Sequence, residues 1–191
     1  MPRPETSVME NKPTINDVIY ALGKEMARLS PGDLARLRRT ADSPLRAPHY
    51  WRWKSRYGWP DRQDDDWACI IAFMAIITPK GRDKDKKSPH NKETRLGKTL
   101  CDGGEAAWPS STPPRPKVSE TRLARLLNAR GQTRRDAVLR LARLLARNNV
   151  SVNCADLAWF LLNDKTDASA QAIARAYYAR LDHAARNDTQ D

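Results

Sequence analysis

The chain is poor in the residues that favour β-sheets and in cysteine. Of its 191 residues only 6 are Val, 7 Ile and 2 Phe, whereas 25 are Ala and 18 are Leu. Ala loses no rotamer freedom in a helix and β-branched residues do, so this composition favours helices over strands. The 3 cysteines are far apart and odd in number, which argues against a disulfide framework and for a reducing compartment.

Long hydrophobic runs are also absent. The longest, residues 67–77, has 11 residues and is too short to span a bilayer. The first twelve residues are polar and lack the apolar stretch of a signal peptide. We therefore expect a cytoplasmic protein that does not associate with membranes.

The sequence lacks the patterns that carry catalytic or metal chemistry. Its three histidines are scattered, no Cys-x-x-Cys pair is present, and the 8 glycines form neither a P-loop nor a dinucleotide-binding fingerprint. Asp64, Asp65 and Asp66 are adjacent, but successive helix positions turn by about 100°, so these carboxylates cannot converge on a metal without further ligands. We interpret them as acids that complement a helix dipole, and predict a non-catalytic protein without metal or cofactor.

What the chain has in excess is basic residues, and they are clustered. Net charge is +11 overall. Residues 36–62, 80–98 and 115–147 carry +6, +5 and +8, so the rest of the chain is acidic at −8. One explanation is that these basic residues lie on solvated helix faces with few acids nearby. Such clustering is more typical, however, of a positively charged surface that binds nucleic acid.

Helical periodicity and capping signals predict an all-α protein. Helices are expected over residues 14–29, 30–40, 67–78, 94–100, 119–130, 133–147, 153–162 and 167–185. Gly103-Gly104 and three prolines, Pro113, Pro114 and Pro116, interrupt the pattern. We therefore predict two small helical bundles, residues 1–101 and 118–191, joined by a linker over residues 102–117.

Residues 49–59 interleave aromatic and basic side chains. One interpretation is a base-stacking platform. We favour the other, in which Tyr50, Trp53 and Tyr57 pack inward at helical spacing, because a small domain with only 2 Phe needs Tyr and Trp for core volume.

Two predicted helices near the C-terminus carry arginines away from their apolar faces. Arg122 and Arg125 lie off the leucine face of the first, and Arg140, Arg143 and Arg147 form a stripe on the second. Because Gly131 separates these two helices, an alternative function is that of a helix-turn-helix DNA-binding regulator. Polar residues suited to reading bases are, however, not evident.

The order of motifs resembles the CasB family, the small subunit of the type I-E CRISPR surveillance complex Cascade. The resemblance covers about residues 30–182. It rests on an ordered series of segments at residues 32–39, 50–52, 58–59, 95–100, 118–127, 140–145 and 156–158. The chain departs from the family in a longer proline-rich segment near residues 105–117 and a longer N-terminus.

The resemblance implies an all-α, non-catalytic subunit present as two copies in the complex. It implies contacts with the backbone and large subunits, the guide RNA and the target and non-target DNA strands, which stabilise the R-loop and hold the displaced strand. The basic positions that match the family pattern, and that we predict to bind nucleic acid, are Arg38, Arg39, Arg62, Lys98, Arg122, Arg125 and Arg143. Further candidates are Arg140, Arg147, Lys86 and Lys87.

Overall fold

The computed structural model describes residues 13–79, 87–105, 107–111, 113–163 and 165–187. Within these ranges it contains nine α-helices and three short 3-10 helices, and the one β-type contact is an isolated bridge between His90 and Val152. The predicted all-α class is confirmed. The α-helices are α1 Ile15–Met26, α2 Pro31–Leu37, α3 Pro48–Tyr57, α4 Asp64–Ile77, α5 Leu96–Asp102, α6 Glu120–Asn128, α7 Gly131–Leu145, α8 Cys154–Leu162 and α9 Ala168–Asn187. The 3-10 helices are η1 Pro44–Arg46, η2 Asp61–Gln63 and η3 Ala146–Asn148.

Local sequence signals set where the first helices begin. Thr14 and Asp17 form a reciprocal capping box at α1. Ser30 caps α2 by accepting a hydrogen bond from the Asp33 backbone N–H, with Pro31 in the first turn. Both helices thus begin within the predicted ranges, but α2 ends at Leu37 rather than near residue 40.

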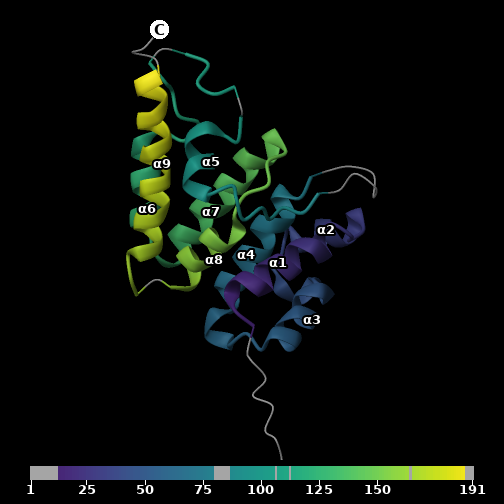
Figure 1. Cartoon of the computed structure of the whole chain (residues 1–191). Coiled ribbons are helices and arrows are strands. Elements are labelled where there is room, and N and C mark those ends of the chain that lie inside the picture. Colours follow the sequence, from purple (N-terminus) through teal and green to yellow (C-terminus); the bar gives the residue numbers. More distant parts are fainter. Residues whose placement is uncertain (1–12, 80–86, 106, 112, 164, 188–191) are drawn as a thin grey trace, which may run out of the picture.

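Helix α4 lies at the centre of the molecule (Figure 1). Ten of its 14 residues are buried, on all sides of the helix. It contacts α1 and α2, which precede it in the sequence, and α7 and α8, which follow it. Its first turn consists of the three aspartates, which places the helix start three residues before the apolar run. An all-round apolar helix must be covered on every face, so α4 organises the core.

The aromatic residues of 49–59 build core rather than a platform for bases. Tyr50 and Trp53 are 0% and 1% exposed, which confirms their predicted inward packing, and Tyr57 is half-buried. The indole N–H of Trp53 donates to Glu25 at 2.7 Å, and the Tyr50 hydroxyl donates to Asp64 at 3.0 Å. The buried polar tips of Tyr50 and Trp53 thus have partners, as such side chains require.

The structure does not show the predicted division into two bundles. Buried residues from both parts of the chain form one hydrophobic cluster. Arg135 of α7 also forms ion pairs with Asp65 and Asp66 at the start of α4, at 3.3 and 3.0 Å. The reason is that α4 is apolar on all sides. Helices α1 and α2 cover only some of its faces, and α7 and α8 cover others.

The described part of residues 102–117, predicted as a linker, packs against α9. Trp108 is 4% exposed, and its indole N–H donates to the Arg115 carbonyl at 3.0 Å. Arg180 of α9 donates to the Trp108 carbonyl and to the Asp102 carboxylate, at 3.1 and 2.8 Å. Proline and glycine indicated that the backbone is irregular here, but they did not indicate that this segment packs against α9.

One further expectation is corrected. Gly131 was expected to end the helix before it, but that helix ends at Asn128 and Gly131, with φ of +51°, begins α7. Trp159 is 41% exposed, although six of the nine residues of α8 are buried. None of the described helices combines the length and apolarity that crossing a bilayer requires.

Gly97 allows α5 to lie very close to α9. A Cβ at this position would overlap the carbonyl oxygen of Ile173 and lie 2.9 Å from the Cβ of Ala176. We expect Gly97→Ala to destabilise the protein by about 2–3 kcal/mol, because the backbone of α9 cannot yield as a flexible side chain can. Urea unfolding measures this difference.

Gly32→Ala is the matched control. A Cβ at Gly32 has only the Ser30 hydroxyl within 4 Å, at 3.8 Å. This substitution within α2 should be neutral or stabilising by up to about 1 kcal/mol. Equal midpoints for the two variants would contradict the close α5–α9 approach.

Arg134 is a structural arginine within the third basic window. It is 5% exposed, its guanidinium lies 4.4 Å from the Phe160 ring centroid, and it donates to the carbonyls of Ala129 and Phe160, both at 2.8 Å. We expect Arg134→Ala to destabilise the protein by about 2–4 kcal/mol, because two carbonyls lose their donor. Arg140→Ala, at an exposed position of the same helix, should stay within about 0.5 kcal/mol of wild type in the same unfolding assay.

Candidate nucleic-acid interface

The basic side chains fall into two sets that the sequence does not distinguish. The first set forms ion pairs with the chain's own carboxylates and joins elements distant in sequence. Its longest-range members are Lys54 with Asp64, Arg56 with Glu25, Arg95 with Asp156, Lys117 with Glu105, Arg130 with Asp167, Arg135 with Asp66 and Arg180 with Asp102. These pairs occupy many of the chain's acids.

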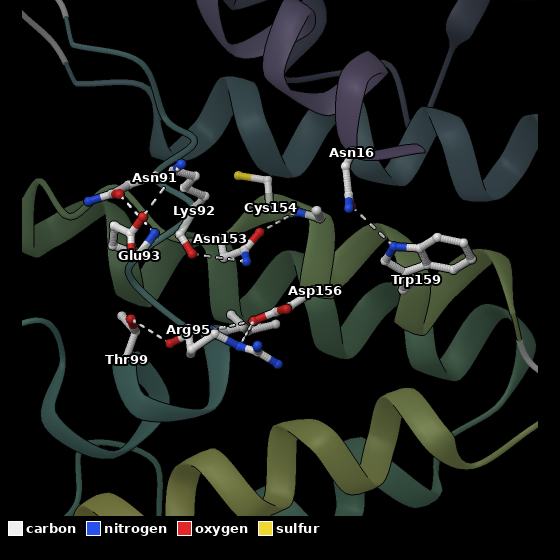
Figure 2. Close-up of polar contacts among 12 residues, drawn as sticks. Asn16, Asn91, Lys92, Glu93, Arg95, Thr99, Asn153, Cys154, Asp156 and Trp159 are labelled. Atoms are coloured by element: carbon white, nitrogen blue, oxygen red, sulfur yellow. Dashed lines mark hydrogen bonds and ion pairs between the residues drawn. The ribbon is translucent and has the colours of Figure 1, made fainter. Parts of the chain in front are cut away.

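One such pair is shown in Figure 2. The Arg95 Nε donates to Asp156 Oδ2 at 3.1 Å, and the backbone N–H of Leu96 donates to the same oxygen at 3.0 Å. Asp156 of α8 therefore satisfies an N–H at the start of α5 while pairing with the arginine before it. Its contribution is to hold α5 against α8, not to face a ligand.

The second set consists of exposed basic residues. Within the described parts of the chain, none of their side chains has a hydrogen bond or an ion pair. Nine of the eleven predicted binding residues belong to it: Arg39, Arg62, Lys87, Lys98, Arg122, Arg125, Arg140, Arg143 and Arg147. No carboxylate in the described parts of the chain therefore pairs with them.

Five of these nine residues lie on adjoining elements. Arg122 and Arg125 are on α6, Arg140 and Arg143 are on α7, and Arg147 is on η3, which continues α7. Helix α6 packs against α7. The leucines between the arginines, such as Leu123, Leu126, Leu141 and Leu145, are buried, so the predicted separation of apolar and basic faces is confirmed.

The other four are on different parts of the molecule. Lys98 lies on α5, and Lys87 lies directly after residues that the structure does not describe. Arg39 follows α2 and Arg62 lies in η2. In the view of Figure 1, α2 and α3 lie on the side of α4 opposite α6 and α9. Arg39 and Arg62 thus do not share the elements that carry the five arginines.

Arg38 has a structural contact that the sequence did not reveal. Its side chain is half-buried, and its Nε donates to the carbonyl of Ala75 in the last turn of α4 at 3.0 Å. Burial also lowers the pKa of its guanidinium. Arg38 thus satisfies a carbonyl at a helix end. Lys86 lies outside the described residues.

The exposed arginines outside the predicted set include two in the first basic window that form no ion pair within the described residues. Arg46 in η1 and Arg52 on α3 have no side-chain partner in the described residues, and η1 and α2 both contact α3. The sequence feature that could have identified them is that both lie in residues 36–62, the window with a net charge of +6.

The chemistry of the second set suits phosphate. A guanidinium is planar and presents paired N–H donors that match two oxygens of a phosphate. Contacts of this kind fix a protein on a nucleic acid but carry no sequence information. Among the described residues, no group of three His, Cys, Asp or Glu is arranged to hold a metal ion.

Comparison with known proteins gives one match. No curated protein and no solved structure matches the chain. A family model described as CRISPR-associated protein Cse2 matches residues 33–178, which confirms the resemblance to CasB. The chain therefore belongs to the CasB/Cse2 family, the non-catalytic small subunit of the type I-E Cascade complex.

Proposed function

We propose that this Cascade subunit binds the sugar-phosphate backbone of nucleic acid without sequence preference through the arginines of α6, α7 and η3. In the complex it lies next to the backbone and large subunits and a second copy of itself. There it contacts the guide RNA and the target and displaced DNA strands and stabilises the R-loop. The protein acts in the cytoplasm, where Cascade meets its target.

One observation carries this proposal. Arg122, Arg125, Arg140, Arg143 and Arg147 are exposed on adjoining elements and have no partner in the described residues, whereas other basic residues of the same window are bound internally. R-loop formation exchanges two duplexes of nearly equal stability, so a few backbone contacts are enough to shift it. Sequence specificity is then left to guide pairing.

The geometry of α7 does not favour the helix-turn-helix alternative. In that motif the first residues of the recognition helix read base edges. Gln132 near the start of α7 instead donates to Asp136 at 2.8 Å and accepts from Arg135 at 3.2 Å. Arg135 itself binds Asp66 of α4 at 3.0 Å. Gln132 and Arg135 near the start of α7 therefore have internal partners.

We expect the double variant Arg122→Ala, Arg125→Ala to bind single- and double-stranded oligonucleotides of unrelated sequence more weakly, and equally so for each sequence. Each lost phosphate contact should reduce the slope of log affinity against log salt by about 0.7–0.9. Fluorescence anisotropy at several salt concentrations measures both quantities.

The control is the double variant Arg36→Ala, Arg56→Ala. It removes the same charge, but these arginines pair with Asp33 and Glu25. It should leave the salt slope unchanged. An unchanged slope in the α6 variant would exclude these arginines as phosphate ligands, and a strong preference for one sequence would favour a base-reading regulator.

A further inference from the structure

A groove lies at the end of the molecule where α1 begins. It has a volume of about 390 Å³ and is lined by the start of α1, the segment between α3 and α4, and the end of α8. None of the described residues that line it is charged. Its aromatic side chains are Tyr57, Trp59, Trp67 and Trp159. This size and this lining suit an apolar side chain of a bound segment rather than an ion or a phosphate.

Two tryptophans of the groove have indole donors without an acceptor. Trp59 and Trp67 stack with ring centroids 4.1 Å apart, and they are 6% and 3% exposed. Neither indole nitrogen has a hydrogen-bond partner within the described residues. Burying a donor without an acceptor is unfavourable, and side-chain rotamer changes that would present such donors are common on binding. The groove therefore favours an occupant that brings backbone carbonyls.

Trp159 forms the open wall of the groove. It is 41% exposed. Its indole N–H donates to the side chain of Asn16 at 3.3 Å, which ties the ring to the first turn of α1 (Figure 2). The exposed ring therefore lies beside the point at which the chain enters α1.

The part of the chain that precedes the described residues leads directly into this groove. Pro13 is the first described residue, is exposed and lines the groove. Residues 1–12, here called the N-terminal segment, come before it. An extended chain spans about 3.3–3.6 Å per residue, so a residue four positions before Pro13 lies within about 14 Å of it. A tether this short gives an effective concentration in the mM range.

The chemistry of the N-terminal segment matches the groove at one place. Its longest run without a charge is residues 6–9, Thr-Ser-Val-Met, and Glu5 and Glu10 flank this run. The Met9 side chain is flexible and polarisable, and a thioether sulfur makes favourable contacts with aromatic rings. The β-branched Thr6 and Val8 favour an extended backbone, which leaves carbonyls available as acceptors.

We propose that the N-terminal segment folds back into this groove as an intramolecular strap. The Met9 side chain lies against the aromatic walls, and carbonyls of residues 6–9 accept from the indole N–H groups of Trp59 and Trp67. The strap holds the start of α1 against the end of α8 and closes the groove to apolar segments of other proteins. The family match begins at residue 33, so the strap belongs to the part of this chain outside that match.

Methyl NMR on the full chain, labelled at the methionine methyl groups, tests the proposal. The Met9 methyl signal, assigned by its loss in Met9→Leu, should show NOEs to indole protons of Trp59, Trp67 or Trp159. It should also lie upfield of the same signal in a synthetic peptide of residues 1–12. Trp159→Ala, at an exposed position, should move it toward the peptide value, because one aromatic wall is lost. None of these signals should depend on protein concentration, since the contact lies within one chain.

A binding experiment distinguishes this occupant from others. The double variant Val8→Ser, Met9→Ser leaves the groove empty, so the peptide of residues 1–12 should bind it and shift the indole N–H resonances of Trp59 and Trp67. Wild type should bind the same peptide at least about tenfold more weakly, because its tethered segment competes at a mM effective concentration. Pro4→Ser is the matched control. It also replaces an apolar residue of the segment by serine, but outside residues 6–9, and should behave as wild type.

Three results would each overturn the proposal. The first is a Met9 methyl signal at the peptide position without NOEs to tryptophan. The second is a peptide that binds wild type and the double variant equally, or binds neither. The third is a contact of Met9 with tryptophan that appears only as the protein concentration rises, which would place the segment in the groove of another molecule.

Discussion

The burial of α4 on all its faces is the constraint on which the rest of this structure depends. A helix in which every residue from Trp67 to Ala75 is buried cannot lie at a surface. It therefore takes α1 and α2 from the part of the chain before it and α7 and α8 from the part after it. Burial of this apolar surface is the main term that stabilises the fold. It also explains why a chain with two apparently separable halves has one continuous core.

The same packing divides the arginines. When α7 lies on α4, the acids of the first turn of α4 come within reach of Arg135, and Arg134 enters the core beside Phe160. The arginines on the outer faces of α6 and α7 have no such neighbours. A long basic window thereby separates into residues that hold helices together and residues that remain available. Rigid helices then present the available ones on a backbone that is already ordered, which suits the proposed binding without sequence preference.

The two ends of the molecule have different chemistry. The end at which α1 begins has a groove whose described lining is aromatic and uncharged, and the opposite end carries the exposed residues Pro113 and Arg115. Neither feature uses the outer faces of α6 and α7.

Much of this protein was determined by sequence alone, because the signals are local. Alanine and leucine content gave the all-α class, Thr14 and Ser30 fixed where helices begin, and the spacing of Leu123, Leu126, Leu141 and Leu145 gave the buried faces. The order of motifs gave the family. The helix starts and buried faces depend on residues within a few positions of one another, so periodicity and capping are sufficient to predict them.

Only the tertiary structure decided which long-range partners meet. It brought Arg38 to the Ala75 carbonyl, paired Arg135 with Asp66, and attached Trp108 to α9, where a linker had been expected. It also placed Trp59 against Trp67 with unpaired donors beside Trp159. The arginine contacts join residues tens of positions apart and depend on how helices pack, so no local pattern encodes whether a given arginine is bound or free.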